Sequence, residues 1–538
     1  MSSQYDAIVM GAGIAGMYQL LKLRELGLNV KVYETGDGVG GVWHWNNYPG
    51  CRFDSESHTY GYSFSDELLQ EWNWTERFAP QPETKRYLNY VADKFDLRKD
   101  IQFNSHVTKA TYDEANTRWS VELEDGSTAS ARFLISATGP LSAYTMPRIP
   151  GVDSFKGDYC HTARWPVGDS GWQGNDFSGL RVGVVGTGAT GTQVIQEVAK
   201  TAKELTVFQL APNWCAPLHN APIEQAEMDE MKANYKDTFQ FLSTTFGAFA
   251  HKFVDTSALD VSEEEREAFF EKLYAEPGFG IWLANYNDIM TSPEANALIT
   301  EFVAKKIRQR VDDPAVADLL IPKDHGFGTR RVPMETNYFE AFNQDNVHLI
   351  DLNKTPIEEI MPEGVRCSDK LYELDLIIYA TGFDAVTGAL KRIDISGKGG
   401  QKLTDKWEDG PRTYLGMQTA GFPNLLTLVG PHNGATFCNI PRCIEQNVEW
   451  VTDLITYMNN NKLVEVEPTL AAEDEWTQHV DDLAQKTLFP TADSWFMGVN
   501  PNNPDAKRTF MLYAGGAPHY KAKCDAVADH DYEGFALK

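Results

Sequence analysis

The stretch FKGDYCHTARWP, residues 155–166, lies between two glycine-rich turns of identical spacing. The first turn is GAGIAG at residues 11–16, and the second is GTGATG at residues 186–191. Gly157 and Pro166 fall inside the stretch and Pro147 and Pro150 precede it, so an irregular connector is expected there. The stretch is therefore predicted to be the hinge between two units that begin with the same kind of turn.

The first turn has the surroundings of a dinucleotide-binding unit. A buried strand is predicted at residues 5–10, a helix from about Ile14 to Leu26, and a second strand at residues 30–33. Glu34 ends that second strand, at the position where a carboxylate accepts hydrogen bonds from an adenosine ribose. The helix N-terminus offers amides and a partial positive charge to a pyrophosphate. The turn glycines expected to approach it are Gly11, Gly13 and Gly16.

The second turn has the same arrangement with one difference. A strand is predicted at residues 180–185, a helix from about Thr190 to Lys200, and a strand at residues 205–208. No carboxylate ends the last strand, which favours NADP over NAD because an acid there would repel a 2′-phosphate. The turn residues expected at this second cofactor are Gly186, Thr187, Gly188, Thr190 and Gly191.

The remaining sequence divides the chain into alternating parts. Apolar strands ending in Ala-Thr-Gly are predicted at residues 133–139 and 376–382, and both resemble the strand-end motifs of two-dinucleotide flavoproteins. Residues 223–325 are charged and helix-like, with a capping box at Ser262 and a helix start at Ser292-Pro293. The expected fold class is α/β, with two Rossmann-like domains for FAD and NADP and a helical insert in the NADP domain. The expected boundaries are 1–145 and 387–538 for the FAD domain, 146–222 with 326–386 for the hinge and NADP domain, and 223–325 for the insert.

Composition limits the possible partners. The formal net charge of −28 argues against nucleic acid and anionic membranes. The chain shows no basic leader, and no apolar run reaches the roughly 20 residues that span a bilayer, so a cytoplasmic protein is expected. Seven cysteines do not suggest a disulfide scaffold. Cys438 and Cys443 have a spacing used by flavin disulfide reductases, but two reduced thiols are the favoured interpretation. No metal site is predicted.

The hinge pattern closely resembles the fingerprint of Baeyer–Villiger monooxygenases, Phe-x-Gly-x-x-x-His-x-x-x-Trp-Pro. Its matching residues are Phe155, Gly157, His161 and Trp165. The resemblance extends over nearly the whole chain. It implies FAD and NADPH as cofactors, and insertion of one oxygen atom of O₂ beside a ketone carbonyl by way of a C4a-peroxyflavin. The products would be esters or lactones, cyclic ketones are the first expectation, and sulfides are a second class of substrate.

The resemblance also assigns site residues. Arg331 matches the arginine that faces the flavin, and Asp54 matches its carboxylate partner; from composition alone, the Arg330-Arg331 pair would be a solvated surface pair and Asp54 a loop cap. The further positions expected at FAD are Val42, Trp43, Trp45, Tyr60, Val107 and Ile440. Those expected at NADP are Arg52, Gln193, Arg330, Arg331 and Trp495, and those expected at the substrate are Ala435, Thr436 and Phe437.

One departure from the family pattern concerns NADP. The family usually has Arg and Thr where this chain has Leu210 and Ala211, and that Arg grips the 2′-phosphate. Arg330 is the remaining candidate for this role. We expect NADPH to stay preferred, with weakened discrimination against NADH.

Three alternatives remain open. The runner-up is a related flavin monooxygenase that oxidises soft nitrogen or sulfur, whose relatives generally lack the Trp-Pro ending and the paired arginines. A pyridine-nucleotide disulfide reductase would need Cys438 and Cys443 to act. A non-catalytic flavoprotein would leave the matches of Arg331 and Asp54 without a reason. Oligomeric state is not readable from the sequence, and a monomer is compatible with it.

Overall fold

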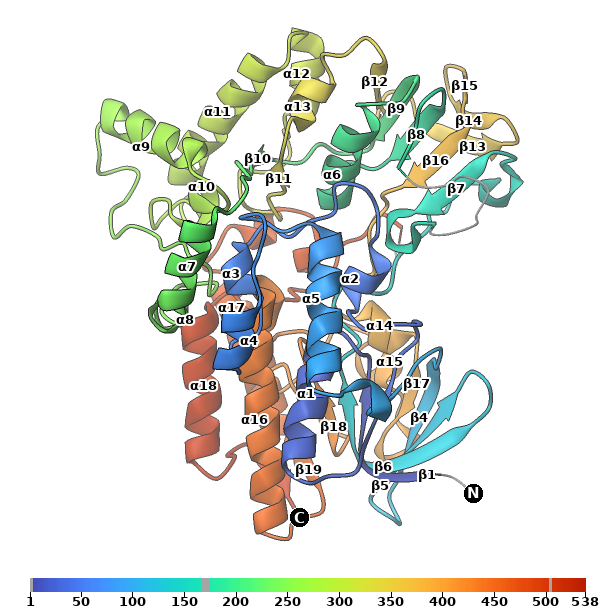
Figure 1. Cartoon of the computed structure of the whole chain (residues 1–538), viewed down its shortest axis with the longest axis vertical. Coiled ribbons are helices and arrows are strands. Elements are labelled where there is room, and N and C mark those ends of the chain that lie inside the picture. The colour runs from blue at the N-terminus through green and yellow to red at the C-terminus, as the bar shows by residue number, and fades with distance from the viewer. Residues whose placement is uncertain (1–2, 167–174, 503–505) are drawn as a thin grey trace.

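The computed structural model describes residues 3–166, 175–502 and 506–538. Within these ranges the larger sheet has eight strands in the order β17-β4-β5-β6-β1-β2-β3, with β18 also paired to β6. Figure 1 shows this sheet in the half of the molecule that contains both described chain ends. Its strands are β1 (Ser3–Met10), β2 (Val30–Tyr33), β3 (Ile101–Gln102), β4 (Val107–Asp113), β5 (Arg118–Leu123), β6 (Thr128–Ser136), β17 (Asp394–Ser396) and β18 (Leu425–Thr427).

The centre of this sheet is parallel and buried. β1 pairs in parallel with both β2 and β6, and its residues Ala7–Met10 are buried. Two buried faces explain the nearly continuous apolar run of this strand. Helix α1 (Ile14–Glu25) packs on the sheet and lies beside α16 (Ile440–Asn460), where Tyr18 donates to Glu449 at 3.0 Å. The predicted strand–turn–helix–strand order of the first unit is confirmed.

A second, five-stranded sheet has the order β12-β9-β8-β16-β7, and all its pairings are parallel. Helix α6 (Ala189–Val198) follows β8 directly, as the second glycine-rich turn predicts. The strands are β7 (Asp158–His161), β8 (Arg181–Val185), β9 (Glu204–Gln209), β12 (Val347–Asp351) and β16 (Leu376–Tyr379). An antiparallel sheet beside them contains β13 (Ile357–Met361), β14 (Gly364–Cys367) and β15 (Leu371–Glu373).

β7 corrects the expectation of a wholly irregular connector. Residues 158–161 of the quoted stretch form the edge strand of the second sheet, where His161 pairs with Tyr379. Gly157 makes the approach possible, because a Cβ there would lie 2.6 Å from the carbonyl oxygen of Asp375. The prolines delimit this strand; none of them falls inside it.

Helices occupy the stretch between β9 and β12, where the insert was predicted. Figure 1 shows most of them on the side of the molecule away from the second sheet, and the last ones beside that sheet. Ser262 and Glu265 form the expected capping box, and Ser292 accepts a hydrogen bond from the amide of Ala295 as an N-cap. The helices are α7 (Gln225–Ala233), α8 (Tyr235–Leu242), α9 (Glu263–Ala275), α10 (Gly280–Leu283), α11 (Pro293–Arg310) and α12 (Pro314–Leu320).

A short two-stranded pairing returns the chain from the insert. β10 (Ala216–Pro217) pairs in parallel with β11 (Met334–Glu335). The other elements pack around the two sheets. They are α2 (Val42–Trp45), α3 (Ser57–Tyr60), α4 (Asp66–Glu71), α5 (Gln81–Lys94), α13 (Tyr338–Ala341), α14 (Gly388–Lys391), α15 (Leu403–Lys406), α17 (Leu470–Ala484), α18 (Ala517–Asp529), β19 (Val466–Pro468) and β20 (Phe535–Leu537).

Within the described residues, no helix combines the length and the apolar character that crossing a bilayer requires. These residues also contain no cluster of three or more His, Cys, Asp or Glu side chains placed to hold a metal ion.

Candidate functional site

The two glycine-rich turns are built alike. Gly11 has φ +106°, and a Cβ there would lie 2.5 Å from the carbonyl oxygen of Ala137. Gly186 has φ +107°, and a Cβ there would lie 2.6 Å from the carbonyl oxygen of Ala380. Each Ala-Thr-Gly strand end thus packs on the first glycine of one turn. Only glycine meets both the left-handed backbone and the close approach, so both motifs have a geometric reason.

The remaining turn glycines have different surroundings. A Cβ on Gly16 would lie 1.9 Å from the carbonyl oxygen of Gly11, and a Cβ on Gly191 would lie 2.3 Å from that of Gly186. A Cβ on Gly188 would have no neighbour within 4 Å. The N-terminus of α6 is therefore open where a phosphate would approach its amides.

Glu34 is buried where the sequence predicts a ribose-binding carboxylate. Its Oε2 accepts the amide of Ala12 at 2.7 Å, and its Oε1 accepts the amide of Gly36 at 2.7 Å. Burial raises the pKa of Glu34, and these two amides act in the opposite direction. A carboxylate has about four acceptor positions, so two remain for ribose hydroxyls.

A segment rich in aromatic residues, 42–60, belongs to the first unit and contacts the second; it is here called the aromatic loop. Trp43 donates its indole N–H to the hydroxyl of Tyr60 at 3.2 Å, and both rings pack on Phe53. Trp45 points elsewhere, with the guanidinium of Arg164 stacked 3.9 Å from its ring centroid. Trp43 and Tyr60 therefore share one aromatic wall, whereas Trp45 contacts the hinge. Val42 is partly buried at the first position of α2, and Val107 is buried at the first position of β4.

Two residues predicted at NADP instead connect the units in this structure. Gln193 on α6 accepts the hydroxyl of Tyr48 at 2.7 Å and donates to the backbone oxygen of Arg52 at 3.0 Å. The guanidinium of Arg52 donates to Glu76 at 3.0 Å and to the backbone oxygen of Phe78 at 2.9 Å. Both polar groups are occupied by protein, so their role at NADP stays a prediction.

Arg331 and Asp54 meet, as predicted, although they are 277 positions apart. The guanidinium Nη2 lies 2.6 Å from Oδ2 of Asp54, whose side chain is 3% exposed. The Phe279 ring of the insert lies 5.1 Å from the guanidinium carbon. Oδ1 of Asp54 is buried and has no hydrogen-bond partner among the described residues. The cation is thus fixed on one side, while 30% of its side chain remains exposed.

Arg330 lies next to this pair and is held differently. Its Nη2 donates to Asp324 at 2.7 Å, and its side chain is 18% exposed. Its buried Nε lacks a partner among the described residues. Leu210, at the end of β9, is 48% exposed. The region expected to bind the 2′-phosphate of NADP thus has Arg330, a cation that already pairs with Asp324, and the apolar side chain of Leu210.

The hinge fingerprint lies beside the two segments that run between the units, one containing Tyr144 and the other containing Phe383. Tyr144 forms an isolated antiparallel bridge with Phe383, and the ring of His161 packs on both, with centroids 4.8 and 6.0 Å away. His161 Nδ1 accepts the amide of Ala163 at 3.0 Å. Burial and then the charge of Arg164 lower the pKa of His161 to about 4. Phe155 and Trp165 are buried. His161 is a neutral packing residue in this position.

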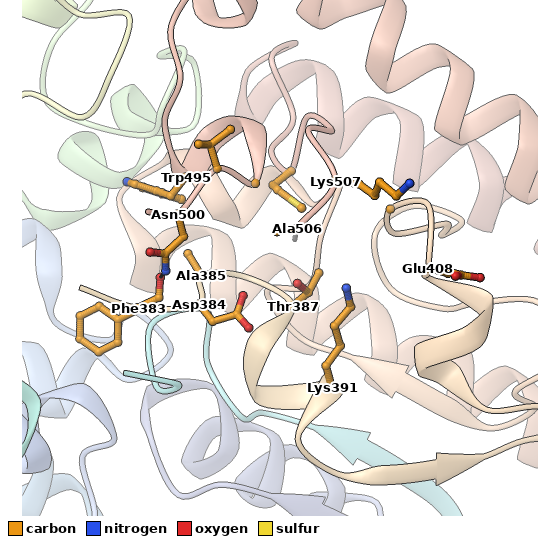
Figure 2. Close-up of a pocket in the computed structure, with 14 residues that line it drawn as sticks. Phe383, Asp384, Ala385, Thr387, Lys391, Glu408, Trp495, Asn500, Ala506 and Lys507 are labelled. Atoms are coloured by element: carbon orange, nitrogen blue, oxygen red, sulfur yellow. Dashed lines mark hydrogen bonds between the residues drawn. The ribbon is translucent and has the colours of Figure 1, made fainter. Parts of the chain in front are cut away.

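A C-terminal loop, which carries Trp495, Asn500 and Asn502, contacts the connecting segment that contains Thr381 and Phe383. Asn500 donates to the backbone oxygen of Phe383 at 2.8 Å, and Asn502 donates to that of Thr381 at 3.0 Å. Trp495, in the 3₁₀ helix η7 (Trp495–Met497), lines a cavity of about 180 Å³ together with Asp384 and Lys391. Figure 2 shows Trp495 and Asn500 on one side of this cavity and Lys391 on another. The loop that carries Trp495, a residue expected at NADP, therefore contacts the second unit through Asn500 and Asn502.

The predicted substrate segment lies at the N-terminus of α16. Phe437 packs on Phe246 and Trp282 of the insert and on Phe489 and Phe496 of the C-terminal region. Ile440, the first residue of α16, is partly buried. Ala435 and Thr436 belong to the 3₁₀ helix η5 (Gly434–Phe437), and their side chains lie outside what the structure describes. Phe437 thus joins three parts of the chain.

Cys438 and Cys443 flank Ile440 and form a disulfide. The expectation of two reduced thiols is therefore wrong in this structure. Cys443 lies in the first turns of α16, which brings it back over Cys438 at a Cα–Cα distance of 6.7 Å.

Several residues at this site were not predicted. Tyr48 holds Gln193, Arg164 stacks between Trp45 and Tyr144, and Phe279 lies against Arg331. Arg164 stands inside the hinge motif, so its position was available from the sequence. Tyr48 and Phe279 are aromatic residues in aromatic-rich segments, and no pattern distinguishes them from ordinary core residues.

Comparison with known proteins agrees with this geometry. Residues 5–217 match the flavin-binding monooxygenase-like family model. The chain is 50% identical to 2-oxo-Δ³-4,5,5-trimethylcyclopentenylacetyl-CoA monooxygenase of Pseudomonas putida, over 100% of this chain and 99% of that protein. It is 42% identical to cyclohexanone 1,2-monooxygenase of Acinetobacter sp., over 99% and 97%. A crystal structure of OTEMO in complex with FAD and NADP superposes with a TM-score of 0.97 at 50% identity, covering 100% of both chains.

The predicted fold class, two Rossmann-like dinucleotide-binding domains with a helical insert, is confirmed by this structural similarity. The chain belongs to the type I Baeyer–Villiger monooxygenases, a group of flavin-dependent monooxygenases.

Proposed function

We propose that this enzyme uses FAD, NADPH and O₂ to convert ketones, cyclic ketones first, into esters or lactones. The observation that carries the proposal is the ion pair between Arg331 and Asp54. This pair joins the second unit to the first, and Phe279 of the insert packs against it. The names of the relatives support the substrate class, since a cyclohexanone monooxygenase and a 2-oxo-trimethylcyclopentenylacetyl-CoA monooxygenase match the chain over nearly its whole length. Sulfides are a secondary class of substrate.

The residues around both turns fit the two cofactors. The open backbone at Gly188 and the remaining acceptor positions of Glu34 are where a phosphate and a ribose would be held. The rings of Trp43 and Tyr60, which meet edge to face, provide apolar surface for an aromatic ring. When bound, FAD supplies the redox chemistry by taking a hydride from NADPH and passing electrons to O₂.

The protein contributes a fixed positive charge. The guanidinium of an arginine is a permanent cation in proteins, so Arg331 can stabilise negative charge that develops on oxygen throughout the reaction. Asp54 fixes the direction of the guanidinium, and Phe279 covers its face. A donor held in place before the reaction needs no reorganisation during it, and such donors contribute about 10²–10³ in rate.

A ketone panel tests the proposal. Purified enzyme with FAD, NADPH and ¹⁸O₂ is given cyclopentanone, cyclohexanone, acetophenone and a thioether, and the products are identified by mass spectrometry. Incorporation of one labelled oxygen into a lactone supports the proposal. Oxidation of the thioether with no ketone converted would favour the heteroatom monooxygenase instead.

A further inference from the structure

The segment that carries Arg331, residues 326–335, is here called the arginine loop. Its first part is held by helix α11 of the insert. Asn296 donates its side-chain N–H to the carbonyl oxygen of Phe327 at 2.8 Å, and Thr300 accepts the amide of Phe327 at 2.9 Å. A Cβ on Gly326 would lie 1.8 Å from Oδ1 of Asn296. Both polar groups of one peptide residue are therefore fixed by adjacent turns of the same helix.

The last part of the arginine loop is held by the other end of α11. Arg310, the final residue of this helix, donates to both carboxylate oxygens of Glu335, at 2.6 and 3.1 Å. It also donates to both oxygens of Glu340, at 2.6 and 2.8 Å, and to the hydroxyl of Tyr274 at 3.1 Å. A guanidinium has five N–H donors, and these five bonds use them all.

The cluster around Arg310 is buried on the side of the arginine loop. The Glu335 side chain is 0% exposed, and its Oε2 accepts the amide of Tyr338 at 2.9 Å as well. The guanidinium lies 5.1 Å from the ring of Phe339. Buried ion pairs give little net stability compared with apolar packing, but they do impose a particular register. Two carboxylates around one cation form an arrangement suited to fixing Glu335 in place.

The two attachments lie on either side of Arg331. Asn296 and Arg310 are separated by 14 residues of one helix, or about 21 Å along its axis. The arginine loop is therefore stretched between two points of a stiff element. Asp54, from the first unit, then holds both Arg331 and, at 3.4 Å, the amide of Met334.

We propose that Arg310 is a positioning residue for Arg331, so that α11 of the insert sets where the guanidinium lies. The inference rests on the proposed function, because it assigns Arg331 its role in oxygen insertion. It gives the insert a task beyond covering the second unit. Arg310 touches neither Arg331 nor Asp54; it acts through Glu335 and the backbone of the arginine loop.

The matched comparison uses three variants of the holoenzyme. Arg310→Lys keeps the charge and loses the paired bonds, and Glu340→Gln weakens the same cluster at its 40% exposed carboxylate. Lys305→Gln is the control, because Lys305 lies on the exposed face of α11 and pairs with Glu267 inside the insert. Measurements are hydrogen–deuterium exchange of residues 326–335, anaerobic flavin reduction by NADPH, and ester formed per NADPH consumed.

Arg310→Lys is expected to raise amide exchange in the arginine loop about tenfold and to leave flavin reduction within about twofold. Ester per NADPH should fall about tenfold, with the balance appearing as hydrogen peroxide, since displacement by about 1 Å costs up to 10²-fold in such sites. Glu340→Gln should act in the same direction with a smaller effect, and it decides the matter if Arg310→Lys fails to fold. Lys305→Gln should change neither quantity.

Unchanged exchange and unchanged coupling in both cluster variants would overturn the proposal, as would equal effects from Lys305→Gln. A wild-type enzyme that forms no ester would refute the proposed function instead, while the exchange comparison would still decide whether Arg310 holds the arginine loop.

Discussion

Tyr48, on the aromatic loop of the first unit, donates its hydroxyl hydrogen to Gln193 on α6 of the second unit across 2.7 Å. Gln193 returns a hydrogen bond to the backbone oxygen of Arg52 at 3.0 Å. Gly50 stands between Tyr48 and Arg52 in the sequence. It lies so close to α6 that a Cβ on it would be 2.6 Å from the carbonyl oxygen of Gln193. The two units are thus joined by a direct polar contact as well as by the hinge.

Tyr48→Phe should weaken this contact without removing the ring. The buried amide oxygen of Gln193 would lose its partner, at an expected cost of about 1–3 kcal/mol. We expect a lower thermal midpoint and a higher KM for NADPH, with kcat changed less. Tyr457→Phe, which removes a hydrogen bond to Asp531 at the surface, is the control. An unchanged midpoint and KM in Tyr48→Phe would show that the contact is unimportant.

Leu210→Arg should raise the preference for NADPH over NADH. The wild-type enzyme has an exposed leucine at the end of β9, and its candidate phosphate-binding cation, Arg330, is bound to Asp324. An added guanidinium gives a charge-assisted bond to the 2′-phosphate, and we expect the ratio of kcat/KM values to rise about tenfold. NADH kinetics should stay constant. Wild-type enzyme that clearly prefers NADH would contradict the assignment of the second site.

The hinge should lose stability in mild acid because of His161. Its pKa is about 4 in the folded protein, against about 6.5 for an unperturbed histidine. The unfolded chain therefore binds the extra proton between these values, so stability is full above about pH 6.5 and declines as the pH falls toward 4. At 1.36 kcal/mol per pH unit, the interval corresponds to about 3 kcal/mol.

The check is the pH dependence of the unfolding midpoint for wild type, His161→Gln and His106→Gln. His161→Gln should flatten the profile between pH 6.5 and 4, whereas the replacement of exposed His106 should not. Equal slopes in all three proteins would remove His161 as the cause.

Replacing both Cys438 and Cys443 by Ser should leave ketone oxygenation and NADPH consumption within about twofold of wild type. The disulfide lies beside Phe437 and Ile440, so small changes in KM for bulky ketones are expected. Loss of all NADPH-dependent activity would revive a dithiol mechanism. Thiol titration with and without reductant checks that the pair is oxidised in the purified wild type.

Sequence patterns predicted the strands beside the two glycine-rich turns, because these strands depend on local features. The strand at β1, the turn at Gly11 and the helix α1 follow from hydrophobic periodicity and from glycine conformation, and these act over a few residues. The capping box at Ser262 and the N-cap at Ser292 were predictable for the same reason. The β7 strand was not, because an edge strand of four residues between prolines forms only by pairing with β16, which is far away in sequence.

The residues of the site likewise divide into those that could be predicted and those that could not. The contact between Asp54 and Arg331 joins residues 277 positions apart, and only resemblance to a known family predicted it. Arg310 could not be found by either route, since a cation near the end of a helix is ordinarily a solvated residue. Its partners Glu335 and Glu340 lie on elements that the fold brings back to α11.

Arg331→Ala in rapid-mixing spectroscopy tests the central claim most directly. The variant is mixed with NADPH under anaerobic conditions, and then with O₂ and cyclohexanone, while flavin absorbance and product are followed. The fixed charge at Arg331 is proposed to serve oxygen insertion alone, so flavin reduction should stay within a few-fold of wild type while ester formation falls at least about 10²-fold. Normal ester formation by Arg331→Ala would contradict the account.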